Sequence, residues 1–217
     1  MSCLRSRPPR FVAGQFGAQR RRWAVLAALV AASASLVLGP VTAFADAQEI
    51  SLDSVFALLA QRPHGHVLYS EEVQSALLKR PLHSSGELFF DAPDRLEKKT
   101  LQPVAQDLIV EGEVLTMVRG KHRASMQLSD YPQLRPLLTG MRATLAGDRS
   151  TLEKNFQLAM TASGSAWTLS LQPLASETAP VYKRIEIRGV DGNVQGVTLE
   201  RANGERTIMS LTEPAGS

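Results

Sequence analysis

The sequence predicts a mainly β protein with a few helices, in which a curved antiparallel sheet forms an incomplete, half-open β-barrel with a helical lid. Three observations predict this fold. From Val67 onward apolar and polar residues alternate, turn residues recur at short intervals, and only two short stretches have a helical pattern. A sheet of about ten strands has to curl or close. Two short amphipathic helices can cover the concave side of a curved sheet but not a flat one of that size.

The first 45 residues have the features of a secretory signal peptide. They contain six arginines and neither lysine nor an acidic residue, followed by an apolar stretch from Ala24 to Gly39. Ala43-Phe44-Ala45 fits a small-x-small cleavage site, so we expect cleavage before Asp46. The apolar stretch is shorter than the roughly 20 residues of a membrane span, which disfavours the alternative of a transmembrane anchor.

Removing this leader changes what the composition implies. The six leader arginines leave 18 basic against 21 acidic residues, a formal charge near −3, so the basic pI of 9.2 belongs to the leader. A nucleic-acid partner therefore loses its compositional support. Cys3 is the only cysteine, so residues 46–217 have no disulfide, thiol nucleophile or thiolate metal site. We expect these residues to form a single exported domain located in the periplasm.

The first element of that domain is a helix predicted over 51–60. Leu52, Val55, Phe56 and Leu59 share one helical face, and Ser51 can cap the free amides at its start. A helix of this length is marginal alone. It must therefore pack its apolar face on the sheet.

Strands follow at regular intervals. Gly-containing pairs at 111–112, 119–120, 191–192 and 203–204 mark hairpin turns, and Ala92-Pro93-Asp94 marks a tight turn between two strands. The predicted strands are 66–75, 84–91, 95–100, 107–111, 113–119, 122–128, 156–161, 166–172, 182–189, 194–201 and 206–211.

One helical excursion interrupts the strands. Pro136 is expected to limit the regular helix to 137–145. Leu137, Leu138, Met141 and Leu145 then share a face, and Asp148 can cap a further turn that extends through Leu152. This helix and the helix over 51–60 are the predicted lid.

Several strands place large apolar residues on one face, which allows two interpretations. The face is either an ordinary packed core or the lining of a cavity, partly vacant, that accepts acyl chains. Methionines at 117, 126, 160 and 209 suit a pocket that adapts to varied cargo. The candidate cavity residues are Phe56, Leu59, Leu88, Phe90, Leu115, Met117, Leu138, Met141, Met160, Trp167, Leu169 and Ile187.

Catalytic and metal-binding patterns are weak in this sequence. His64-Gly65-His66 has a spacing that can hold a metal, but no carboxylate lies nearby in sequence. No Gly-x-Ser-x-Gly elbow or glycine-rich phosphate loop is present. Glu71-Glu72 and Glu97-Lys98-Lys99 are expected on solvated strand faces. We therefore expect no enzyme, no metal site and no cofactor.

Several segments together resemble a known family. They are Gly86–Pro93, Ile109–Leu115, the helix at 137–141, Trp167–Pro173 and Ile185–Ile187 with Asp191-Gly192. The chain resembles the LolA-type periplasmic outer-membrane lipoprotein carriers over most of residues 46–217, and Ala92–Lys98 is most similar to their LolA-related subgroup.

The resemblance implies a function as well as a fold. It implies a monomeric carrier or chaperone that binds the acyl chains of a lipoprotein or glycolipid in an apolar cavity and transfers this cargo toward the outer membrane. An inner-membrane transporter would be the donor and an outer-membrane receptor the acceptor. The alternative from another class is a lipid-sensing or scaffolding periplasmic domain that regulates a membrane partner.

Two departures from the family pattern bear on this expectation. The family's arginine before the proline, which latches the lid to the first helix, aligns with Ala92, and Arg95 is out of register. The chain also ends soon after Leu211, without the extra C-terminal strand and loop of the classical carriers. Both departures argue against classical lipoprotein trafficking but leave the expected cavity and compartment unchanged. The suspected cargo of the LolA-related subgroup is an outer-membrane glycolipid or polyene lipid.

Overall fold

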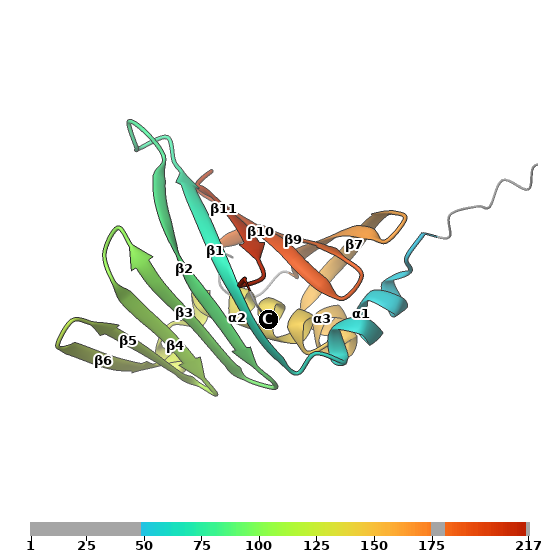
Figure 1. The fold of residues 1–217 in the computed structure, drawn as a ribbon, viewed down its shortest axis with the longest axis horizontal. Helices are drawn as coiled ribbons and strands as arrows, with labels where there is room; N and C mark the ends of the chain where they lie inside the picture. The colour runs from blue at the N-terminus through green and yellow to red at the C-terminus, as the bar shows by residue number, and fades with distance from the viewer. Residues whose placement is uncertain (1–48, 175–180, 216–217) are drawn as a thin grey trace, which may run out of the picture. The chain divides into compact units, whose positions relative to one another are not determined.

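One antiparallel sheet dominates the described part of the chain (Figure 1). The computed structural model describes residues 49–174 and 181–215. Within them lie eleven strands, at the positions that the alternation predicts and with ends shifted by a few residues. The strands are β1 (His64–Gln74), β2 (Leu82–Asp91), β3 (Arg95–Gln102), β4 (Gln106–Glu111), β5 (Val114–Arg119), β6 (His122–Gln127), β7 (Phe156–Ser163), β8 (Ala166–Pro173), β9 (Tyr182–Val190), β10 (Asn193–Arg201) and β11 (Arg206–Thr212).

The strand order shows how the sheet is built. It runs β6-β5-β4-β3-β2-β1-β11-β10-β9-β8-β7, with antiparallel pairing throughout. Neighbouring strands are consecutive in sequence except at the centre, where β1 pairs with β11 and Tyr69 lies opposite Leu211. Strands β6 and β7 are the two edges and do not pair with each other. The sheet is therefore an incomplete barrel, as predicted.

The predicted hairpin turns have the backbone that their residues favour. Gly112 turns between β4 and β5 with φ of +55°, a conformation that costs glycine little. In the turn between β9 and β10 it is Asp191, not Gly192, that has positive φ, at +49°. Aspartate tolerates this left-handed region better than most residues.

Three α-helices accompany the sheet within the described residues, and two of their caps were predicted. Helix α1 spans Leu52–Ala60, and the Ser51 hydroxyl accepts a hydrogen bond from the Ser54 amide at 3.1 Å. Helix α3 spans Arg149–Asn155, and Asp148 accepts from the Thr151 amide at 3.0 Å.

Helix α2 (Arg135–Leu145) begins earlier than predicted. Two short 3₁₀ turns, η1 (Leu128–Asp130) and η2 (Pro132–Leu134), precede it. The expectation that Pro136 excludes itself from the helix was wrong. A proline in the first turn forfeits no intrahelical hydrogen bond, so the helix contains it.

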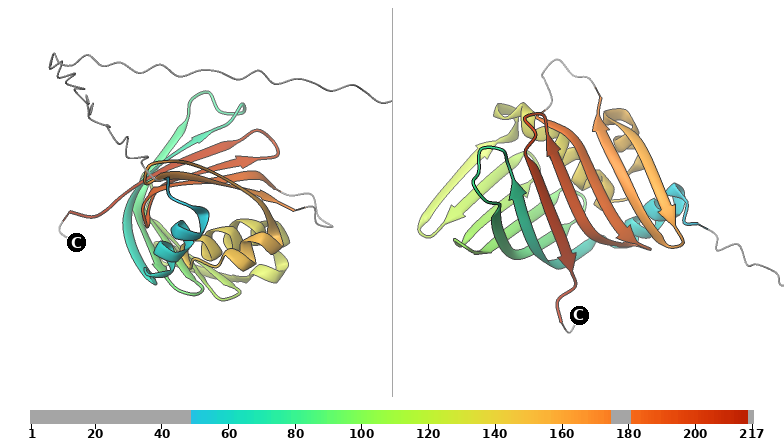
Figure 2. Two further views of the ribbon diagram at one scale, coloured as in Figure 1. Left: turned by 90° about the vertical axis from the view of Figure 1, so that its right-hand side faces the viewer. Right: turned by 90° about the horizontal axis from the view of Figure 1, so that it is seen from above.

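The route of the chain explains where the helices lie. After the edge strand β6, residues 128–155 carry the chain to the opposite edge, β7. Figure 2 shows α2 and α3 inside the curve of the sheet, with α1 beside them. The connection that links the two edges thus covers the concave face.

The packed core is densest where the helices meet the later strands. There α1 and α2 meet β7–β10, and Leu169, Leu171 and Ile185 are fully buried. A methyl group in place of the Gly140 hydrogen on α2 would lie 3.1 Å from Phe156, which shows how close the contact is. On the earlier strands Phe90 and Val110 are buried, whereas Leu88 and Leu115 remain half-buried. No helix in the described ranges has the length and apolar character needed to cross a membrane.

Candidate functional site

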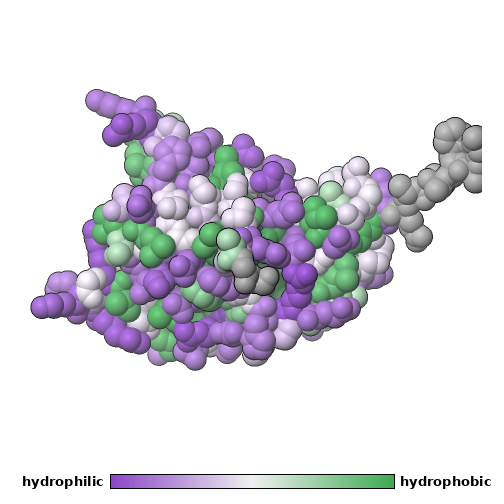
Figure 3. Space-filling model, in the orientation of Figure 1, coloured by the Kyte–Doolittle hydropathy of each residue, from purple (hydrophilic) through white to green (hydrophobic). Residues whose placement is uncertain are grey.

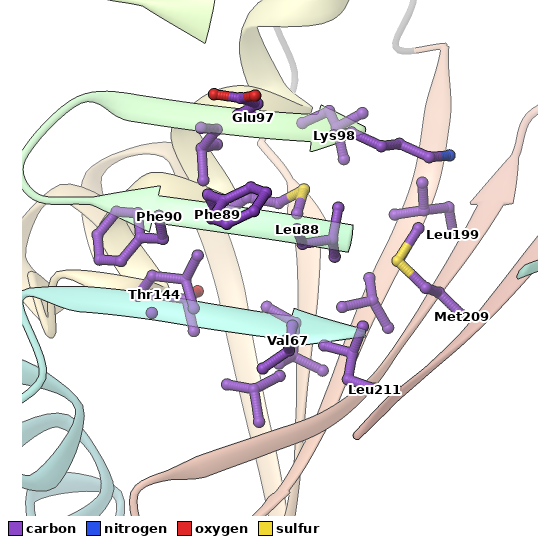
Figure 4. A pocket seen from close by; sticks show the side chains of 18 of the residues that line it. Val67, Leu88, Phe89, Phe90, Glu97, Lys98, Thr144, Leu199, Met209 and Leu211 are labelled. Atoms are coloured by element: carbon purple, nitrogen blue, oxygen red, sulfur yellow. The ribbon is translucent and has the colours of Figure 1, made fainter. Parts of the chain in front are cut away.

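A large cavity lies on the part of the concave face that the core does not fill. Its volume is about 1180 Å³, and its walls come from β1–β5, β9–β11, α1 and α2 (Figure 4). Ligand pockets for small molecules usually measure about 300–1,000 Å³. This cavity therefore has room for a ligand larger than an ordinary metabolite.

Helix α2 forms one wall of the cavity with its apolar face. Leu137, Leu138, Met141 and Leu145, which the sequence placed on one helical face, all line the cavity, together with Leu134. The Thr144 hydroxyl donates to the Gly140 carbonyl at 2.7 Å, so it presents no free polar group there.

Seven of the predicted cavity residues lie on the cavity wall. They come from both helices and from both halves of the sheet, so the cavity is assembled from segments far apart in sequence. These residues are Leu59, Leu88, Phe90, Leu115, Leu138, Met141 and Ile187. Their contact with a ligand stays a prediction.

The other five predicted residues lie elsewhere. Phe56, Trp167 and Leu169 are buried in the packed core, where the Trp167 indole donates to the Asp191 carbonyl at 2.8 Å. Met160 is half-buried against that core, and Met117 shares a face of β5 with Leu115 but does not line the cavity. The structure divides the predicted apolar face into a filled part and an open part.

Several apolar wall residues were absent from the predicted set. They follow from the strand register: Val67, Leu88 and Lys98 lie in one row across β1, β2 and β3, and the row continues through Leu108 on β4. Alternation on each strand signals these positions, but only the pairing register shows that they meet. The wall residues found in this way include Val67, Leu96, Leu108, Val110, Leu199, Met209 and Leu211.

Charged residues also line the cavity, and two of them lie there contrary to the sequence interpretation. Glu71 and Lys98 were expected on solvated strand faces, but both lie on the concave side. Adjacent residues of a strand point to opposite faces, so the runs Glu71-Glu72 and Glu97-Lys98-Lys99 could not be solvated along their whole length. Figure 4 shows the Lys98 side chain extending toward Leu199 and Met209, while Glu97 points away from them.

Arg142 anchors helix α2 to the sheet. Its Nη2 atom donates to the Gly112 carbonyl in the β4–β5 turn at 2.7 Å. Burial lowers the pKa of the Arg142 guanidinium, and the nearby carboxylates of Asp94 and Glu113 offset part of that effect. A hydrogen bond from Arg142 thus joins α2 to the β4–β5 turn.

The other end of the lid is joined to α1. Arg149 at the start of α3 pairs with Asp53 of α1 and with Glu153 of its own helix. At Gly147, between α2 and α3, a Cβ atom would lie 2.5 Å from the Phe56 carbonyl oxygen. The three helices therefore pack as one layer.

Two histidines of β1, His64 and His66, border the cavity and form local pairs. His64 Nδ1 lies 2.9 Å from Asp91 Oδ1, and the His66 ring stacks on Phe89 with the ring centroids 4.4 Å apart. Within residues 49–174 and 181–215, no three His, Cys, Asp or Glu side chains are grouped so that they could hold a metal ion.

The outer surface is mixed in character. Figure 3 shows hydrophobic residues in separate groups among hydrophilic ones, with the β1–β2 hairpin projecting beyond the rest. The tip of that hairpin carries Leu77, which is 92% exposed. The apolar residues that line the cavity lie inside the curve of the sheet.

A scan against protein families matches residues 44–215 to the model described as outer membrane lipoprotein carrier protein LolA-like. No curated protein matches the chain.

Three solved structures of bacterial proteins are among those similar to this chain. A LolA superfamily protein of Nitrosomonas europaea is 9% identical, with 76% of this chain and 92% of that chain covered and a TM-score of 0.41. The MucA/MucB complex of Pseudomonas aeruginosa is 16% identical, with 76% of this chain and 59% of that chain covered and a TM-score of 0.39. A putative outer membrane lipoprotein-sorting protein domain of Vibrio parahaemolyticus is 10% identical, with 75% of this chain and 92% of that chain covered and a TM-score of 0.37.

Proposed function

The chain belongs to the LolA-like family of outer membrane lipoprotein carrier proteins, and from this premise we propose that it carries acylated cargo. It binds the acyl chains of a lipoprotein or glycolipid in the cavity between the sheet and α2. It then transfers this cargo toward the outer membrane, and it works as a monomer.

One observation supports this proposal above all: the apolar cavity of about 1180 Å³ beneath α2. Each methylene group that moves from water into such a site contributes ~0.8 kcal/mol. Two or three acyl chains therefore supply ample affinity, even after the cost of immobilising them. The cavity needs no specific polar contact to hold a hydrocarbon chain.

Transfer then depends on exchange between apolar sites. Cargo enters when α2 moves away from the β4–β5 turn, which requires the Arg142 contact with Gly112 to break. Release follows when a receptor offers the acyl chains a better apolar site. An inner-membrane transporter as donor and an outer-membrane receptor as acceptor complete the proposed route.

Native mass spectrometry of protein expressed with its leader and recovered from the periplasm tests the proposal. We expect a chain that begins at Asp46 and carries copurified lipid as a monomer. After collision-induced release of that lipid, the measured mass should equal that of the mature chain without lipid. A chain that retains residues 1–45, or one that never carries lipid under any gentle condition, would contradict the proposal.

A transfer assay separates a carrier from a lipid sensor. Loaded protein is mixed with acceptor vesicles, and the lipid that remains on the protein is measured over time. A carrier passes its lipid to an acceptor. A sensor keeps its lipid and instead binds a membrane partner.

A further inference from the structure

A small polar cluster interrupts the apolar wall of the cavity. Glu71 on β1 and Lys98 on β3 both line the cavity, and Glu71 Oε2 lies 2.6 Å from Lys98 Nζ. Ser84 on β2 donates to the other carboxylate oxygen at 2.9 Å. Three adjacent strands thus hold a charged pair in place within an apolar surface.

Within the cluster, the Lys98 ammonium group keeps hydrogen-bond donors that the cluster does not use. Both oxygens of Glu71 have partners, and its side chain is only 12% exposed. The Lys98 ammonium group has three hydrogens, and the Glu71 carboxylate is its one hydrogen-bond acceptor among the residues that the structure describes. Lys98 can therefore donate a further hydrogen bond into the cavity.

Tyr69 contacts the Lys98 ammonium group through its ring and accepts no hydrogen bond from it. Its ring centroid lies 4.9 Å from Lys98 Nζ, a cation–π distance, and its hydroxyl donates to Thr100 at 2.7 Å. Tyr69 itself is buried. The direction of Lys98 is therefore fixed by one contact with a carboxylate and another with a ring.

The pair is neutral in sum, and other charged residues at the cavity also have partners: Glu97 lies 2.8 Å from Arg95. Arg201 lies 3.2 Å from Glu205, and Arg62 lies 4.0 Å from Glu213. An anionic headgroup at Lys98 would approach the Glu71 carboxylate and be repelled by it. An uncharged carbonyl oxygen would accept the hydrogen bond without that repulsion.

We propose that Lys98, held by Glu71, determines ligand specificity by donating a hydrogen bond to the uncharged ester or amide carbonyl at the head of an acyl chain. Glu71 meanwhile discriminates against free fatty acids. This inference rests on the proposed function, because it requires that acyl chains occupy the cavity. Leu88 and Leu108, which flank Lys98 across the sheet, would contact the first methylene groups of the chain.

The test compares two ligands that share an acyl chain and differ in charge. Laurate and its glycerol monoester displace a fluorescent acyl probe at neutral pH, and the ratio of their Kd values is measured for each variant. Glu71→Gln keeps the shape of the side chain and removes its charge. We expect this variant to improve laurate binding relative to the monoester by about tenfold, the size of a charge-assisted hydrogen bond.

Matched controls lie on the opposite face of the same strands. Glu72→Gln and Lys99→Met make the same chemical changes at positions outside the cavity wall. We expect both to keep the wild-type ratio. If Glu71→Gln also keeps that ratio while both ligands bind, Lys98 and Glu71 do not set specificity, although the proposed function stands.

A double variant covers the case in which Glu71→Gln fails to fold. Glu71→Gln with Lys98→Met leaves no buried charge unpaired. We expect it to bind the monoester about fivefold more weakly, through loss of one hydrogen bond. Unchanged monoester binding would overturn the inference. If neither ligand displaces the probe from the wild-type protein, the proposed function fails as well.

Discussion

Gly147 determines how closely the lid approaches the first helix. Its φ of +68° is a conformation that glycine adopts easily, and a Cβ there would lie 2.7 Å from the Ala60 Cβ atom. Gly147→Ala should lower the free energy of unfolding by about 1–3 kcal/mol through overpacking, in addition to backbone strain. Urea denaturation measures the loss.

Gly120 provides the matched control for this prediction. Its φ of +59° is similar, but an added Cβ would meet nothing within 4 Å. Gly120→Ala should therefore cost only the backbone strain, about 1–2 kcal/mol. Equal losses for the two variants would show that the contact with α1 contributes nothing.

Asp148 makes the stability of the lid depend on pH. Two hydrogen bonds hold the pKa of the Asp148 carboxyl below its ordinary value of 3.8. The one from the Thr151 hydroxyl has the larger effect, and the one from the Thr151 amide has the next largest. A lowered pKa means that the folded state favours the charged form. The stabilisation is therefore present above the unfolded-state pKa and is lost as the pH falls through the folded-state pKa.

Asp148→Asn isolates this effect, because asparagine also caps helices. At neutral pH the wild type should be more stable by about 0.5 kcal/mol, the usual contribution of a charge at a helix N-terminus. The difference should shrink as the pH falls below the ordinary aspartate range. Thermal unfolding over a pH series measures it, and a difference independent of pH would contradict the assignment.

Single residues also show where prediction from the sequence ends. Leu88 and Leu169 have the same alternating context, yet Leu169 is fully buried and Leu88 lines the cavity. The difference lies in where α2 crosses the sheet, and no local pattern encodes that position. Lys98 was misplaced for another reason: its charge suggested solvent, while the alternation with Leu96 indicated the concave face.

At the level of elements, the strands and helix caps were predictable because their causes are local. A hairpin such as β4–β5 needs only two alternating runs and a turn glycine between them. The pairing of β1 with β11 is different, because more than a hundred residues separate them. Nothing in either strand specifies the other, so this central pair emerged only from the structure.

Arg142 is expected to control how easily α2 leaves the sheet. Arg142→Met removes the hydrogen bond to the Gly112 carbonyl while keeping an unbranched apolar stem. Amide exchange across α2 should accelerate about tenfold, because a hydrogen bond from a charged group contributes about 1.5–3 kcal/mol before the helix relaxes. Exchange in β7–β10 should stay unchanged.

The matched control for this prediction lies on the same helix. Arg135 is exposed at the start of α2, so Arg135→Met changes the charge of the helix without touching the β4–β5 turn. We expect its exchange in α2 to match the wild type. Acceleration of equal size in both variants would assign the effect to helix charge rather than to the anchor.

At the scale of the whole domain, the cavity results from an unequal match between sheet and helices. The eleven-stranded sheet presents a long concave face, and the connection from β6 to β7 supplies only α2 and α3 to cover it. Helix α3 packs against α2 and β7, while α2 packs against β9 and also forms a wall of the cavity with β1–β5 and β9–β11. A sheet this large with so few helices retains apolar space that its own side chains do not fill.

The central claim, that this space binds acyl chains, is tested most directly by the Kd of a fluorescent acyl probe for two leucine variants. Leu138→Glu places a carboxylate in the cavity wall, whereas Leu77→Glu makes the same change at the exposed hairpin tip. We predict that Leu138→Glu weakens binding at least about a hundredfold, the cost of an unpaired charge in an apolar site, and that Leu77→Glu leaves the Kd unchanged. Equal binding by a folded Leu138→Glu protein would contradict the account.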